Sequence, residues 1–161
     1  MLDYGFKGKV YPLNPKGGEI KGLKMYANIK DIPEPVDYVI SCVPASATPQ
    51  LIKDCTAKGV KVIQFYTSGF SEAGTEEGER LEKEICLLAH HSGIRIIGPN
   101  CLGVHCPKTS FSFPGGFVKE SDSVGFICQS GGNTVSLLRE AIRRGVRFSK
   151  VVSYGNAADI S

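Results

Sequence analysis

The chain has 161 residues, of which 42% are hydrophobic and 22% are charged, and its formal net charge is +3. This length corresponds to about one domain and is sufficient to bury a core without disulfide support. The composition is ordinary for a globular protein, which excludes a disordered, collagen-like or coiled-coil chain. The sequence has no apolar window of about 18 residues, so we expect no membrane span, and the charge excess is too small to indicate nucleic-acid binding.

The six cysteines are irregularly spaced, and no C-x-x-C pair occurs. Cys42 and Cys128 lie in apolar runs, where a free thiol behaves as a small buried hydrophobic group. We therefore expect neither a disulfide scaffold nor a metal site in this chain. The first residues also lack the basic start and the apolar stretch of a signal peptide, so we expect a reducing, cytoplasmic setting.

Strand-like and helix-like segments alternate from the N-terminus onward. We expect strands at residues 9–13, 36–43, 60–66 and 94–97. A helix capped by Ser46 or Thr48 and ending at Gly59 follows the second strand, and another helix spans residues 75–92. Strand–helix–strand crossovers of this length are right-handed and produce a parallel sheet. The predicted fold class is therefore α/β with a doubly wound parallel sheet.

The pattern is interrupted and then starts again. Residues 107–122 are rich in Pro, Gly, Ser and Thr and have no clear period, which is typical of a connecting segment. After them we expect a strand at 123–128, a helix at 133–144 and a strand at 150–153. The sequence thus predicts a first domain at 1–112, a connector at 113–122 and the start of a second α/β domain at 123–161.

In doubly wound sheets a ligand binds outside the carboxyl ends of the strands, and the first such end is at residues 13–18. An NAD-binding fold usually places an acidic residue near this point to hold a ribose hydroxyl. This chain has Asn14 and Lys16 there, followed by two glycines, which suits a phosphorylated ribose. The alternative is a solvated turn with a surface lysine.

Two further strand ends carry polar groups. The strand at 60–66 runs into Thr67, Ser68 and Gly69, whose hydroxyls and amides can hydrogen-bond a polar ligand without adding charge; the alternative is a capped turn. The next strand is followed by a rigid bend that presents Asn100 and Cys101. A histidine four positions after Cys101 suggests a nucleophile–base pair, which we discount because no helix is predicted there to align the two side chains.

A glycine-rich turn precedes the helix of the second domain. Ser130, Gly131 and Gly132 follow the strand directly, and such a turn lets backbone amides converge at the positive end of the helix dipole. The turn suits a phosphate, but it matches neither the Walker loop nor the G-x-G-x-x-G motif. The alternative is a plain glycine-rich helix start.

Five motifs occur in order along the chain. They are GFKGKVYPLNPK at 5–16, IPEPVD at 32–37, TSGF at 67–70, GPNCLG at 98–103 and QSG at 129–131. Together they resemble the nucleoside-diphosphate-forming acyl-CoA synthetases, which include ADP-forming acetyl-CoA synthetase and the succinyl-CoA synthetase alpha subunit. The resemblance covers essentially the whole chain.

The resemblance implies a Rossmann-like domain that binds coenzyme A (CoA), followed by a flavodoxin-like domain. It implies that Lys16 meets the nucleotide phosphates, that Val43 and Pro44 pack on the adenine or pantetheine, and that Asn100 and Cys101 lie near the thiol. The implied CoA-binding residues are Asn14, Pro15, Lys16, Val43, Pro44, Tyr66, Thr67, Ser68, Gly69, Asn100 and Cys101. The residues implied to hold the phosphate of a phosphohistidine intermediate are Ser130, Gly131 and Gly132.

The family reaction converts an acid, CoA and a nucleoside triphosphate into acyl-CoA, nucleoside diphosphate and phosphate, reversibly. Its phosphorylated histidine lies beyond residue 161, so we assign no catalytic residue and expect the chain alone to be inactive. The resemblance implies an ATP-grasp domain or beta subunit that holds the Mg-nucleotide, and an oligomer. Val135 stands where succinate-specific members carry a tyrosine, which argues against succinate.

The resemblance also implies that a central first strand of the sheet is absent from this chain. We therefore expect a rearranged sheet, a neighbouring chain in the gap, or residues upstream. Two other functions stay open: a non-catalytic CoA-binding module, regulatory or fused to an acyltransferase, and an NADP-dependent oxidoreductase. The acyl substrate and the choice of ADP or GDP do not follow from the sequence.

Overall fold

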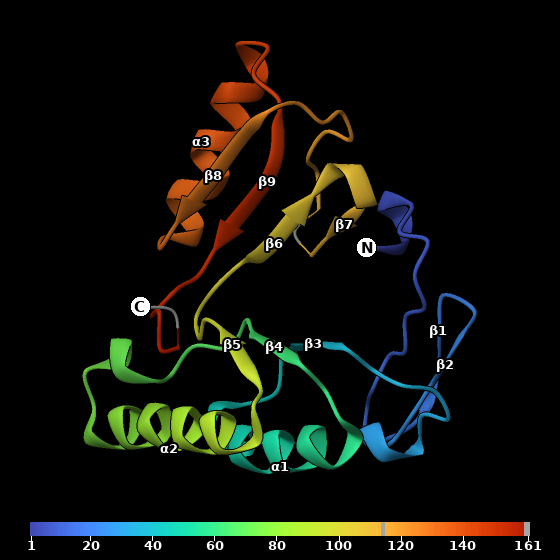
Figure 1. Cartoon of the computed structure of the whole chain (residues 1–161), viewed down its shortest axis with the longest axis vertical. Helices are drawn as coiled ribbons and strands as arrows, with labels where there is room; N and C mark the ends of the chain where they lie inside the picture. The colour runs from blue at the N-terminus through green and yellow to red at the C-terminus, as the bar shows by residue number, and fades with distance from the viewer. Residues whose placement is uncertain (114, 160–161) are drawn as a thin grey trace.

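A computed structural model describes residues 1–113 and 115–159 of the chain. It contains a three-stranded sheet, a four-stranded sheet and a two-stranded hairpin. Figure 1 shows the three-stranded sheet with two helices beneath it; the four-stranded sheet lies above, with one helix beside it, and the hairpin lies to one side. Short 3₁₀ helices lie at Leu2–Tyr4, Ile29–Asp31, Ala45–Ala47, Ser71–Ala73 and Pro107–Thr109.

The first sheet consists of β3 (Tyr38–Ser41), β4 (Val62–Phe65) and β5 (Arg95–Ile97), in that spatial order and all parallel. The connections are α1 (Thr48–Lys58) and α2 (Glu76–Ser92), which contact each other and lie on the same face of the sheet (Figure 1). The predicted α/β class with a parallel sheet and crossover helices is confirmed.

Local sequence explains where the helices begin and end. Gly59 ends α1 in the left-handed conformation with φ +78°, as predicted. The predicted caps Ser46 and Thr48 are wrong, because Ala47 takes the cap position without a side-chain hydrogen bond. The Thr48 hydroxyl instead donates to a backbone carbonyl three residues earlier, at 2.6 Å. Thr75 caps α2 with its hydroxyl oxygen.

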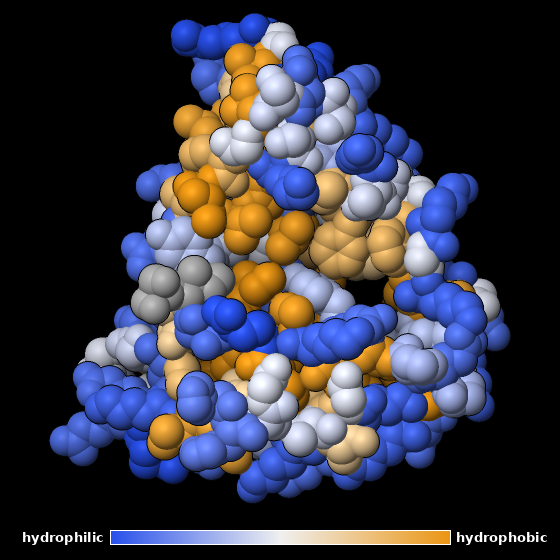
Figure 2. Space-filling model, viewed as in Figure 1, coloured by the Kyte–Doolittle hydropathy of each residue, from blue (hydrophilic) through white to orange (hydrophobic). Residues whose placement is uncertain are grey.

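The main core lies between this sheet and its two helices. Leu81, Ile85 and Ala89 recur at four-residue steps along α2 and are all buried, so that one face of the helix packs on the sheet. Ile63 of β4 and Ile52 of α1 are at most 1% exposed. Burial of each large aliphatic side chain contributes about 1.5–3 kcal/mol. Figure 2 shows the outer surface of α1 and α2 as largely hydrophilic, with hydrophobic residues gathered in the middle of the molecule.

The second sheet has the spatial order β7-β6-β9-β8. Its strands are β6 (Gly103–Cys106), β7 (Phe111–Ser112), β8 (Val124–Cys128) and β9 (Phe148–Ser153), and α3 (Gly131–Arg143) connects β8 to β9. β8 runs parallel to β9, whereas β6 is antiparallel to both β7 and β9. The sequence did not predict β6 and β7. Strand pairing groups residues 103–112 with the second sheet, and the division into domains at 113–122 stays a prediction.

The strand predicted at residues 9–13 is wrong. The segment forms only an isolated bridge between Leu13 and Tyr26, beside the hairpin of β1 (Gly18–Ile20) and β2 (Leu23–Met25). Pro12 has no N–H to donate to a ladder, and its carbonyl accepts a bond from Tyr26 N at 3.0 Å. Within the described residues, β4 is the one strand that pairs with β3.

A buried glutamine links the two sheets. Gln64 of β4 is fully buried, accepts a hydrogen bond from the Tyr38 hydroxyl at 2.8 Å and donates to the Leu102 carbonyl at 3.1 Å. Gly103 passes directly over this side chain with φ +76°, and a Cβ there would lie 1.9 Å from the Gln64 amide. The start of β6 therefore requires glycine for both backbone conformation and space.

Gly103→Ala should lower the free energy of unfolding by about 3 kcal/mol or more, because overpacking adds to the left-handed strain. Gly59→Ala is the matched control, since Gly59 has φ +78° and a Cβ added there would meet nothing within 4 Å. The control should lose about 1 kcal/mol. Urea unfolding of both variants measures the difference, and equal losses would contradict the close approach to Gln64.

Candidate functional site

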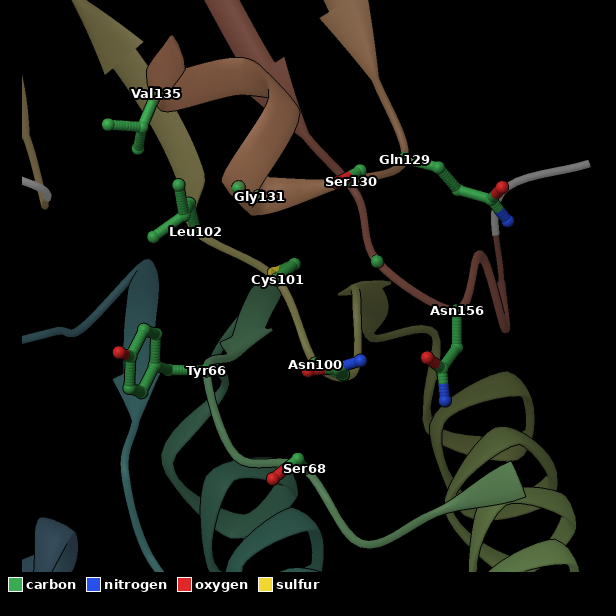
Figure 3. A pocket seen from close by; sticks show the side chains of 12 residues that line it. Tyr66, Ser68, Asn100, Cys101, Leu102, Gln129, Ser130, Gly131, Val135 and Asn156 are labelled. Carbon is green, nitrogen blue, oxygen red and sulfur yellow. The ribbon is translucent and has the colours of Figure 1, made fainter. Parts of the chain in front are cut away.

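A cavity of about 730 Å³ lies between the carboxyl end of β4 and the carboxyl ends of β8 and β9. Figure 3 shows side chains from the end of β4, the linker after β5, the start of α3 and the segment after β9 around the same space. The lining residues are Tyr66, Ser68, Asn100, Cys101, Leu102, Gln129, Ser130, Gly131, Gly132, Val135, Gly155 and Asn156. The position agrees with the rule that ligands bind outside the carboxyl ends of parallel strands.

Residues 98–102 form the linker that crosses from β5 to β6 along one side of the cavity. Asn100 N donates to the Thr67 carbonyl at 2.9 Å, and Cys101 N donates to the Phe65 carbonyl at 3.3 Å. These bonds tie the linker to the end of β4. Asn100 has φ +55°, an unusual conformation that asparagine tolerates better than most residues. The backbone therefore holds the Asn100 side chain at the cavity wall.

The segment after β4 presents alternating residues to the cavity. Tyr66 is 48% exposed, and its ring meets the Phe113 ring edge-on with centroids 5.2 Å apart. Thr67 does not line the cavity, because its hydroxyl donates to the Val43 carbonyl at 2.5 Å. Ser68 lines the cavity again, and Gly69 follows with φ +101°. The hydroxyl groups of Tyr66 and Ser68 are thus available to a polar ligand.

The start of α3 supplies the opposite wall. Ser130 caps the helix, and its hydroxyl oxygen accepts a hydrogen bond from Asn133 N at 3.2 Å. The first amides of a helix have no acceptor within the helix, and the dipole gives this end a partial positive charge. A Cβ at Gly131 would lie 2.9 Å from Leu102 Cγ, so glycine permits the helix to approach the linker. This wall is suited to an anion.

The cavity wall is electrically neutral, since its twelve residues include no Lys, Arg, His, Asp or Glu. Burial raises the pKa of the Cys101 thiol to about 12, so the thiol stays protonated at neutral pH. His105 is buried elsewhere, with Nδ1 3.0 Å from Ser112 Oγ, and burial lowers its pKa. Cys101 and His105 therefore do not form a nucleophile–base pair. The wall can bind through hydrogen bonds and the helix dipole.

The structure brings together part of the predicted site. The predicted residues that line the cavity are Tyr66, Ser68, Asn100, Cys101, Ser130, Gly131 and Gly132. Thr67 and Gly69 flank it, and the Val43 carbonyl contacts Thr67, with Pro44 next in the chain. The predicted residues at 14–16 lie in a turn before the hairpin, outside the cavity lining. Asn14 Oδ1 accepts from Lys16 N at 3.0 Å, which closes the turn and leaves the lysine side chain exposed.

Sequence reasoning did not assign five residues that line the cavity. They are Leu102, Gln129, Val135, Gly155 and Asn156. Gly155 and Asn156 follow the carboxyl end of β9, so the rule that identified the other strand ends could have found them. Gly155 is the tightest position, because a Cβ there would lie 1.9 Å from the Pro99 carbonyl oxygen.

Neither a metal-binding cluster nor a membrane-spanning helix occurs in the part of the chain that the structure describes. No group of three or more His, Cys, Asp or Glu side chains in residues 1–113 and 115–159 could hold a metal ion. Nor does any helix in this part of the chain have the length and apolar character needed to cross a membrane.

Comparison with known proteins identifies the family. Residues 1–107 match the family model described as the CoA binding domain, and residues 121–161 match that of the succinyl-CoA ligase like flavodoxin domain. The chain belongs to the CoA-binding domain family, and the flavodoxin-like match follows it in the order that the sequence predicted.

Curated relatives of this chain include ADP-forming acetate–CoA ligases. The ADP-forming acetate–CoA ligase II subunit alpha of Pyrococcus furiosus is 41% identical over 153 residues, which are 95% of this chain and 33% of the relative. The ADP-forming acetate–CoA ligase of Methanocaldococcus jannaschii is 42% identical over 158 residues, 96% of this chain and 22% of the relative. The chain thus spans a third or less of these two proteins. The resemblance to acyl-CoA synthetases that form a nucleoside diphosphate is confirmed.

Solved structures agree. A dinucleotide forming acetyl-coenzyme A synthetase 1 from Ca. Korarchaeum cryptofilum, in complex with phosphate and ADP, superposes with a TM-score of 0.90 at 39% identity. The match covers 99% of this chain and 34% of that one. The chain corresponds to the CoA-binding portion of such synthetases.

The buried thiol leads to a labelling prediction. Cys42 is exposed, although its apolar run predicted burial. At pH 8, iodoacetamide should modify Cys42 much faster than Cys101, because only about one Cys101 thiol in ten thousand is ionised. Cys55 is the matched control, since it is also buried and burial raises its pKa to about 12. Mass spectrometry of digested protein measures each rate. If Cys101 reacts as fast as Cys42 while Cys55 stays protected, the cavity holds an activated thiol and our description is wrong.

Proposed function

We propose that this chain binds CoA and is the CoA-binding portion of an acyl-CoA synthetase that forms a nucleoside diphosphate. The observation that carries the proposal is the neutral cavity at the strand ends, in a chain whose first 107 residues match the CoA binding domain. CoA ends in a neutral thiol and amide-rich arm, which suits a wall of hydroxyl, amide and backbone groups.

The thiol end of CoA is assigned to the cavity, beside Asn100 and Cys101. The adenine or pantetheine is assigned to Val43 and Pro44, and the nucleotide phosphates to Lys16, with the ribose phosphate as its main contact. Two features support this path: the Lys16 side chain is exposed, and the Thr67 hydroxyl joins the segment at Val43 to the cavity wall. Asn14, Pro15 and Gly69 contribute backbone turns along the same route.

The start of α3 is assigned to a phosphate. Ser130, Gly131 and Gly132 offer a hydroxyl and helix amides without a fixed counter-charge, which suits a phosphoryl group that must arrive and leave. The Korarchaeum synthetase was solved in complex with phosphate and ADP, and this supports the assignment.

The parent reaction joins an acid to CoA, uses a nucleoside triphosphate and is reversible. Its phosphohistidine and its Mg-nucleotide are assigned to parts of the parent protein outside this chain, in an ATP-grasp domain or beta subunit. The greater length of the relatives supports this division. Six free thiols support a reducing, cytoplasmic location, and an oligomer is proposed from the family.

Calorimetry with CoA and NADP tests the proposal. The chain should bind CoA saturably and should give no heat of binding with NADP at the same concentration. Tight binding of NADP without binding of CoA would replace the proposal with an oxidoreductase function.

Lys16→Ala should weaken binding of CoA by about tenfold and leave binding of dephospho-CoA nearly unchanged, because a charge-assisted bond to the ribose phosphate is lost. Lys53→Ala removes an exposed lysine from α1, away from the proposed path, and is the control for net charge. Calorimetry with both ligands gives the comparison. An equal loss for CoA and dephospho-CoA would refute the assignment of Lys16 to the ribose phosphate.

A further inference from the structure

The segment that follows β9 returns to the first sheet and docks on it. The backbone N–H groups of Asn156 and Ala158 donate to carbonyls of the 98–102 linker, at 2.9 and 3.1 Å. The Asp159 carboxylate accepts from Ile96 N at 2.8 Å. These bonds fix the backbone around Asn156 and leave its side chain to reach across the rim of the cavity (Figure 3).

The Asn156 side chain meets two carboxylates at once. Its Nδ2 donates to Glu72, and it lies 2.7 Å from Oε2 of Glu82 and 3.3 Å from Ser71 Oγ. The Ser71 hydroxyl in turn donates to the other oxygen of Glu82 at 2.8 Å. An amide nitrogen has two hydrogens to donate, so one can serve each carboxylate.

Glu72 also bonds to the turn that follows the cavity residue Ser68. Its Oε1 accepts hydrogen bonds from Gly69 N at 2.6 Å and Phe70 N at 3.3 Å. These are the amides directly after Ser68, a residue of the cavity wall. Burial opposes ionisation of Glu72, but bonds from Asn156 and the two amides outweigh it and lower its pKa. The ionised carboxylate therefore holds the turn.

The two carboxylates need a neutral donor between them. Neither Glu72 nor Glu82 takes part in an ion pair of the described residues. Like charges that converge on one point repel each other unless a donor satisfies both. Asn156 supplies that donor, whereas alanine at this position would leave the two charges facing each other.

We infer that Asn156 is a positioning residue, which holds Glu72 so that Glu72 can fix the turn that presents Ser68 to the cavity. The inference rests on the proposed function where Ser68 is taken to contact CoA. The part of the inference that concerns the turn at Gly69 and Phe70 rests on the hydrogen bonds alone. No contact of Asn156 with the ligand is required.

Asn156→Ala tests the inference by hydrogen exchange. The Gly69 and Phe70 amides should exchange about tenfold faster, because Glu72 moves away from Glu82 and releases them. CoA affinity should fall by about fivefold. Glu72→Gln should speed the same two amides while Asn156 stays in place, which gives a second reading if Asn156→Ala folds poorly.

Two double variants separate the positioning of Glu72 from a general effect of negative charge on the helix. Asn156→Ala with Glu82→Gln removes the facing charge and should restore much of the protection and affinity. Asn156→Ala with Glu76→Gln removes one charge from the first turn of α2, the helix that also carries Glu82. This double variant should restore neither the protection of the amides nor the affinity for CoA.

Two results would overturn the inference: unchanged exchange of Gly69 and Phe70 in Asn156→Ala, or equal recovery in both double variants. Absence of CoA binding in the unmodified chain would overturn the proposed function instead. The exchange measurement would then still decide the role of Asn156, because it requires no ligand.

Discussion

The cavity depends on two crossings of the backbone between the sheets. The linker at 98–102 leaves β5 and enters β6, and the segment after β9 returns to hydrogen-bond with that linker. Because the two crossings are tied together, the carboxyl ends of the parallel strands of both sheets face the same space (Figure 1). Gly103 and Gly155 are required at these crossings, since a Cβ at either one would meet an atom at 1.9 Å.

A neutral wall determines what chemistry the cavity can support. Its twelve residues include no Lys, Arg, His, Asp or Glu, and burial raises the pKa of the Cys101 thiol to about 12, so the wall has no carboxylate, imidazole or thiolate to act as a general base. This agrees with the binding function that we propose for the cavity. Glu72 and Glu82 accept hydrogen bonds from the lining residue Asn156, and Glu72 also accepts from the Gly69 and Phe70 amides. This arrangement is consistent with a chain that holds CoA while other parts of a larger protein supply the reactive groups.

The features that the sequence predicted correctly depend on residues that are close together in the chain. The α2 face and its glycine stop follow from spacing within one segment, and Ser68, Asn100 and Ser130 were found because strand ends can be recognised individually. The strand at 9–13 failed because pairing needs a partner strand, which no local pattern specifies. The strand-end rule could have identified Asn156 as a cavity residue, but not its role, since its contacts with Glu72 and Glu82 span 84 and 74 positions of the chain.

The central claim is that the strand ends of both sheets form one site for CoA. A crystal structure of this chain with CoA bound tests it most directly. We expect the thiol end of the ligand between Asn100 and the start of α3, with the adenosine part outside the cavity, towards Val43 and Lys16. CoA bound at another face of the molecule, with this cavity empty, would contradict the account.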